Sequence, residues 1–193
     1  LALQTNFIWA LILSGTISAL LALSLSFPVF RVRGDYLAIV TLGFGFIIRI
    51  LAINSPTITN GSLGINDIPE YSNLYWTGGI AIITVIAILN IIYSKFGRAM
   101  KAVRDDEDAA TAMGINTFKI KTLAFTTSAF FEGVGGGLLA ALLTSISPDL
   151  FTFFLTFQLL IIIVLGGLGS TTGAILGTIF VMAGLEWMRF LDE

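Results

Sequence analysis

Cysteine and histidine are both absent from this sequence of 193 residues. Without them the chain can form no disulfide framework, no thiolate or imidazole metal site and no His general base. The Ser-His-Asp and Cys-His nucleophile arrangements are excluded for the same reason. We therefore expect no catalytic residues, no metal site and no cofactor.

Charge is also scarce: 11% of the residues are charged, 56% are hydrophobic, and the mean hydropathy is +0.95. An ordinary soluble domain has about 25% charged residues. The net charge of −2 gives no reason to expect a nucleic-acid partner. A bilayer core needs about 20 apolar residues per helix, and several uncharged runs reach that length. The sequence predicts an all-α, polytopic transmembrane protein, a single domain over residues 1–193 with about five to six membrane segments, at residues 7–30, 36–53, 75–93, 122–143, 150–165 and 174–188.

The longest uncharged run, from Leu150 to Leu185, has to be broken. Its 36 residues would form a helix about 54 Å long, too long for one crossing. Glycine and hydroxyl residues gather near its middle, at Gly166, Gly167, Gly169 and Ser170, and mark the break. Two interpretations stay open: a discontinuous pair of helices around a translocation site, or a tight hairpin between two spans.

The basic residues predict the orientation. The segment 94–121 contains six of the ten basic residues, whereas the segment 54–74 contains none. The positive-inside rule places 94–121 in the cytoplasm and 54–74 outside, as expected for a multi-pass protein of the cell inner membrane. The six basic residues are Lys95, Arg98, Lys101, Arg104, Lys119 and Lys121. The first four recur every third residue, which on a helix continuing the preceding span makes a basic face suited to membrane lipid phosphates.

The same loop contains a short helix with signals at both ends. Asp106 is a suitable N-cap, further acids follow in the first turn, and Gly114 comes just past the end. The helix from Asp106 to Met113 is rich in alanine, so another protein could approach its backbone closely. The alternative is a solvated helix that only connects two spans.

Several motifs follow one another in a fixed order and together resemble a known family. They are the segments 31–45 (RVRGDYLAIVTLGFG), 60–65 (NGSLGI), 97–99 (GRA), 108–114 (DAATAMG), 146–148 (ISP) and 164–170 (VLGGLGS). From about residue 31 to the end, the chain is similar to ABC importer permeases for branched-chain amino acids, of the LivM type. Phe46 stands where that family usually has an acid. Family members have further helices before and after this stretch, which predicts a fragment lacking both ends.

The resemblance implies a cytoplasmic coupling loop that contacts separate ATPases. Its residues here are Glu107, Asp108, Ala109, Ala110, Met113 and Gly114. A glutamate commonly leads this loop in the family, and whether Glu107 or Asp108 takes that role stays open. The implied partners are two ABC ATPase subunits, a second permease subunit and an extracytoplasmic amino-acid-binding protein.

Glu132 lies near the middle of the 122–143 span, where an ionisable residue is costly and a candidate for function. Four glycines follow it closely, so a neighbouring helix can approach. Its carboxyl group either lines the translocation path or forms a structural hydrogen bond. The same path is predicted to include Gly166, Gly167, Gly169 and Ser170, while Gly169, Gly173 and Gly177 form a close-packing stripe.

The leading hypothesis is therefore the permease subunit of an ATP-driven importer for branched-chain or related apolar amino acids, not itself an enzyme. The alternative is an ion-coupled secondary transporter in which Glu132 titrates during transport. A third possibility is a structural or assembly membrane protein that does not transport a solute.

Overall fold

The computed structural model describes residues 2–32 and 36–192 of a chain built from helices. Arg33, Gly34 and Asp35 of the family-like segment lie outside the described residues. Within the described ranges β-structure is limited to one isolated antiparallel bridge, between Ile65 and Ile146. The chain divides into two compact units, residues 1–146 and 147–193. The predicted all-α class is confirmed.

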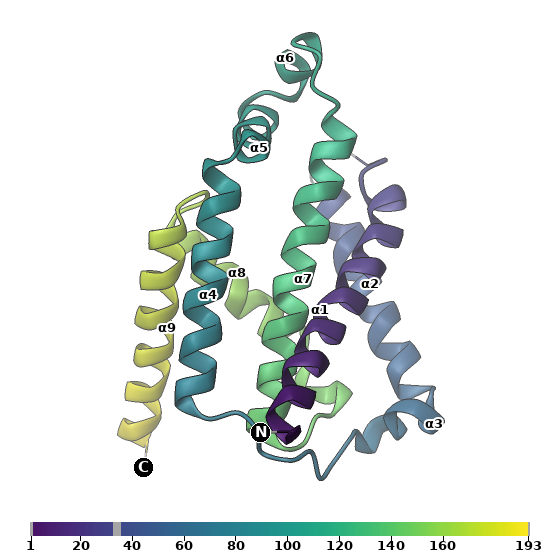
Figure 1. The fold of residues 1–193 in the computed structure, drawn as a ribbon, viewed down its shortest axis with the longest axis vertical. Helices are drawn as coiled ribbons and strands as arrows, with labels where there is room; N and C mark the ends of the chain where they lie inside the picture. The colour runs from purple at the N-terminus through teal and green to yellow at the C-terminus, as the bar shows by residue number, and fades with distance from the viewer. Residues whose placement is uncertain (1, 33–35, 193) are drawn as a thin grey trace. The chain divides into compact units, whose positions relative to one another are not determined.

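The first unit contains three of the long apolar helices, α1 (Ala2–Val29), α4 (Leu74–Tyr93) and α7 (Thr117–Leu143). Between α4 and α7 the chain forms two short helices, α5 (Lys95–Asp105) and α6 (Glu107–Ala112). Figure 1 shows α5 and α6 at one end of α4 and α7, and the segment between α2 (Tyr36–Ile53) and α4 at the other end. This arrangement fits the prediction that 94–121 and 54–74 lie on opposite sides of the membrane.

Helix α2 ends in a bend that the sequence analysis did not predict. Residues 39–53 and 56–63 form a pair of apolar segments bent by 77°, either a broken span or a re-entrant loop. After the bend come α3 (Pro56–Thr59) and η1 (Gly61–Leu63). Pro56 has no backbone N–H and starts the new helix at its first position. The Thr59 hydroxyl donates to the Ala52 and Ser55 carbonyl oxygens, which ties α3 back to the end of α2.

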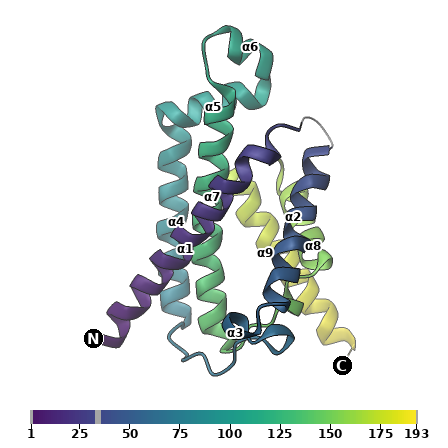
Figure 2. The ribbon, with the colours of Figure 1, turned by 90° about the vertical axis from the view of Figure 1, so that its right-hand side faces the viewer.

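Helices α1 and α7 cross at a contact made of small residues (Figure 2). A Cβ atom at Gly133 would overlap Ser18 Oγ and lie 2.7 Å from the Ser14 carbonyl oxygen. The Ser14 hydroxyl donates a 2.6 Å hydrogen bond to the Gly133 carbonyl oxygen. In a membrane, such close contacts stabilise helix pairs because lipid provides no hydrophobic drive between them. Beside this crossing, Phe7, Leu11, Leu138 and Ala141 form a buried apolar cluster.

The second unit is a helical hairpin of α8 (Phe153–Gly166) and α9 (Thr171–Asp192). A Cβ atom at Gly173 would overlap the Gly166 carbonyl oxygen, and one at Gly177 would lie 2.9 Å from the Ile162 carbonyl oxygen. The predicted glycine stripe therefore consists of Gly173 and Gly177 on α9, facing α8. The assignment of Gly169 to that stripe is wrong: Gly169 lies in the turn before α9 with φ +87°, a left-handed conformation that suits glycine.

The α1–α7 contact generates a test of stability. Gly133→Ala forces the α1 backbone at Ser14 to move, and overpacking of this kind costs about 1–3 kcal/mol. We expect a lower unfolding temperature of the detergent-solubilised protein, followed by tryptophan fluorescence. Gly136→Ala is the matched control, because a Cβ there meets nothing within 4 Å. Equal unfolding temperatures for the two variants would contradict the close contact.

Candidate functional site

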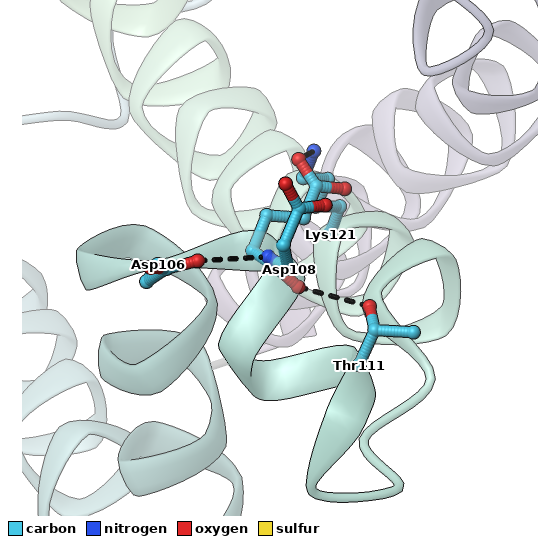
Figure 3. A network of polar contacts seen from close by, with 5 residues as sticks. Asp106, Asp108, Thr111 and Lys121 are labelled. Atoms are coloured by element: carbon cyan, nitrogen blue, oxygen red, sulfur yellow. Dashed lines mark hydrogen bonds and ion pairs between the residues drawn. The ribbon is translucent and has the colours of Figure 1, made fainter.

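Helix α6 begins at a well-formed N-cap. The Asp106 carboxylate accepts hydrogen bonds from the backbone N–H groups of Asp108 and Ala109, both 2.9 Å long (Figure 3). Glu107 and Asp108 lie in the first turn, where the positive end of the helix dipole stabilises negative charge. The predicted helix is confirmed, with observed bounds Glu107–Ala112.

The C-terminal end of α6 is also capped by hydrogen bonds. The Gly114 N–H donates to the Thr111 carbonyl oxygen and the Ile115 N–H donates to the Ala110 carbonyl oxygen, at 2.9 and 3.0 Å. This pair of bonds is the Schellman arrangement, which requires a left-handed residue after the cap. Gly114 provides it with φ +82°. Gly114 therefore has a definite structural reason to be glycine.

The two faces of α6 differ. Ala110 is buried, at 3% exposure, and Glu107 is partly buried. Asp108, Ala109, Ala112 and Met113 are exposed, and Met113 reaches 83% exposure. At 3.6 residues per turn these four occupy one contiguous side of the helix. We call them the outer face of α6: one acid, two small residues and one flexible apolar side chain.

The structure separates the roles of the two neighbouring acids. Lys121 Nζ, on α7, donates to Glu107 Oε2 at 2.5 Å, and both side chains are about one-third exposed, at 30% and 34%. Asp108 is exposed and lies on the outer face instead. Of the two candidates for the leading acid of the coupling loop, Asp108 is therefore the more accessible to another protein. Sequence reasoning missed Lys121, because nothing local indicates which lysine meets which acid.

Helix α5 is not a continuation of α4, contrary to the expectation for the basic segment. Ser94 ends α4 and caps α5, with its hydroxyl donating to the Ile91 carbonyl oxygen at 2.6 Å and accepting from the Gly97 N–H at 3.3 Å. A Cβ at Gly97 would lie 2.5 Å from the Ile91 carbonyl oxygen, so this elbow needs glycine. The basic residues of α5 are all exposed. They are Lys95, Arg98, Lys101 and Arg104.

Glu132 lies in the middle of α7 on the side opposite to the α1 contact. It is exposed in the first unit, as are Ser128 and Gly136 one turn away on either side, whereas Gly133 is buried against α1. Among the described residues its carboxyl group has no hydrogen-bond or ion-pair partner.

The other predicted path residues belong to the second unit: Gly166 ends α8, Gly167 and Gly169 have positive φ, and Ser170 Oγ accepts from the Gly173 N–H at 3.0 Å. Across residues 2–32 and 36–192, no group of three or more acidic, His or Cys side chains could hold a metal ion.

These features define a class: a polytopic α-helical membrane protein that displays a short, doubly capped helix at one end of its spans. Residues 1–191 match the family described as the permease component of branched-chain amino acid transport systems. The chain belongs to that family of transport permeases.

Two relatives are high-affinity branched-chain amino acid transport system permease proteins named LivM. The chain is 39% identical to that of Salmonella typhimurium and 38% identical to that of Escherichia coli K12, in each case over 94% of this chain and 51% of the relative. The LivH permease protein of Salmonella typhimurium is 32% identical over 63% of this chain and 41% of the relative. The chain spans about half the length of the LivM relatives. No solved structure matches it significantly.

The N-cap of α6 generates a second test. Asp106→Ala removes the acceptor for two backbone N–H groups, which costs about 1 kcal/mol, or about fivefold in local opening. We expect amide hydrogen exchange at Asp108 and Ala109 to rise by that factor. Asp105→Ala is the control, because the Asp105 carboxylate pairs with the adjacent Arg104 and caps no helix. The same exchange in both variants would contradict the capping assignment.

Proposed function

We propose that the chain is the membrane-spanning part of an ATP-binding cassette importer for branched-chain or related apolar amino acids. The observation that carries the proposal is the outer face of α6. This face is exposed and its side chains are mostly small. Because α6 is capped at both ends, the helix can enter a groove in another protein without unfolding. Membership of the permease family supports the substrate class.

ATP is bound and hydrolysed by two separate ATPase subunits in this proposal. The chain's own glycine-rich stretches are unsuited to a nucleotide. Gly133 to Gly137 lie inside α7, and Gly166 to Gly173 run from the end of α8 into the start of α9 and contain no lysine. A phosphate-binding loop needs free backbone N–H groups and a lysine at a helix N-terminus. The permease therefore receives mechanical work through α6, whose Asp108, Ala109 and Met113 contact the ATPase.

The remaining partners follow from the same proposal. A second permease subunit completes the pathway, and the LivH relative is a protein of that kind by its name. An extracytoplasmic binding protein delivers the amino acid on the side of residues 54–74. The chain lies in the inner membrane with 94–121 in the cytoplasm, where exposed basic side chains of α5 face anionic lipid headgroups.

Glu132 lies on the translocation path in this proposal. An exposed carboxyl group at mid-span is costly against lipid, and the opposite side of α7 is already packed on α1. A water-filled path satisfies the carboxyl group and lets it attract the ammonium group of the amino acid. Gly166, Gly167, Gly169 and Ser170 are retained as candidate path residues on the second unit.

The whole assignment is tested by uptake of labelled leucine into vesicles that contain the complete transporter with its ATPases, second permease and binding protein. We expect uptake to require ATP and the binding protein. Uptake driven by an imposed ion gradient without ATP would overturn the importer proposal in favour of a secondary transporter.

Ala109→Trp tests the outer face of α6. A bulky side chain on this exposed face blocks close approach of the ATPase, so we expect at least a tenfold loss of ATPase co-purified with the permease and a matching loss of uptake. Ile58→Trp is the control for bulk in the co-purification, because Ile58 is 79% exposed on α3, at the other end of the first unit. Normal co-purification with Ala109→Trp would exclude α6 as the docking helix.

Glu132→Gln tests the path. The variant keeps the shape of the side chain and removes its charge, so we expect the KM for leucine uptake to rise at least threefold while ATP hydrolysis stays unchanged. Ser128→Ala, one turn away on the same side of α7, controls for any change on this face. An unchanged KM in Glu132→Gln would remove Glu132 from the path.

A further inference from the structure

The junction between α6 and α7 is a turn that contains a glycine in the left-handed conformation. Between the two helices the backbone passes through Gly114, which has φ +82° and nothing within 4 Å of a Cβ position. Such a glycine can absorb changes of φ and ψ at little cost. A displacement of α6 would therefore rotate the backbone at Gly114 without moving α7, unless another contact connects the two helices.

The Glu107–Lys121 ion pair is such a contact. Glu107 is the first residue of α6, and Lys121 lies just beyond the first turn of α7. Their 2.5 Å contact bypasses the turn at Gly114 and joins the two helices through side chains. Partial burial of both partners reduces screening by solvent. Lys119, two residues earlier on α7, is exposed and has no ion-pair partner among the described residues.

Lys121 also lies on a particular side of α7. Eleven residues separate it from Glu132, which is close to three full turns, so the two positions lie on the same side of the helix about 16 Å apart. Helix α7 runs without interruption from Thr117 to Leu143. A displacement applied at Lys121 is therefore carried along one continuous helix to the side that bears Glu132.

From these observations we propose that the Glu107–Lys121 ion pair is a latch that makes α6 and α7 move as one body. Within the function proposed above, on which this inference rests, Asp108 and Ala109 receive the ATPase while Glu107 holds the receiving helix to the spanning helix. Lys121 is a positioning residue: it contacts neither ATP nor the transported amino acid, and it acts through the orientation of α6.

The test measures leucine uptake and ATP hydrolysis in the same proteoliposomes of the complete transporter. Glu107→Gln and Lys121→Gln each remove one charge of the latch with little change of shape. We expect each variant to assemble with the ATPase and hydrolyse ATP, but to transport at least threefold less leucine per ATP. The double variant Glu107→Gln/Lys121→Gln is expected to match Glu107→Gln, because that single variant already removes the ion pair.

Two further variants separate the latch from a general effect on folding. Lys121→Arg keeps the charge and the reach and is expected to retain at least half of the normal ratio of transport to hydrolysis. Lys119→Gln removes a neighbouring charge that pairs with no acid in the described part of the chain, and it is expected to leave the ratio normal. A normal ratio in both single variants, or losses that multiply in the double variant, would overturn the latch.

The outcomes distinguish the latch from the docking proposal. Loss of ATPase binding in Ala109→Trp together with a normal ratio in Glu107→Gln and Lys121→Gln would retain the docking helix and reject the latch. Normal ATPase binding in Ala109→Trp would reject the docking helix itself, whatever the latch variants do.

Discussion

Hydrocarbon solvates neither peptide groups nor charges, and the rest of this structure follows from that constraint. The apolar stretches are helical because a helix satisfies its own backbone groups, and charges concentrate where the helices end. The cytoplasmic loop predicted between two spans, residues 94–121, contains six of the ten basic residues together with four acids. The segment that we propose as the docking site for other proteins is therefore the segment that the bilayer cannot hold.

The same constraint explains why glycine and serine form the contacts between long helices. In water, burial of large apolar side chains would draw the helices together, but in lipid those side chains gain little by leaving it. Gly133 and Ser14 hold α1 to α7, while Gly166, Gly173 and Gly177 hold α8 to α9. Both pairs rely on close backbone approach. One side of α7 is thereby occupied, and the side with Glu132 is left for another role.

The parts that could be predicted from sequence are those specified by neighbouring residues. The long helices follow from hydropathy, and α6 follows from Asp106 and Gly114, because both caps and the helix lie within nine residues. The elbow at Ser94 and the bend before Pro56 were missed, although each has a local signal in a capping serine or a proline. The Glu107–Lys121 pair could not be predicted, since it depends on how α6 folds back on α7. The functional roles of the outer face and of Glu132 stay predictions.

The close approach of α8 and α9 at Gly166 and Gly173 limits the residues that relatives can have at these two positions. The atom that excludes a side chain at Gly173 is a backbone carbonyl oxygen of Gly166, and the reverse also holds. No exchange of side chains elsewhere can create room, because the obstructing atoms are part of every amino acid. Evolution can therefore alter these positions only by separating the helices. Invariance at this pair in an alignment would record backbone geometry, and would say nothing about which solute passes through the membrane.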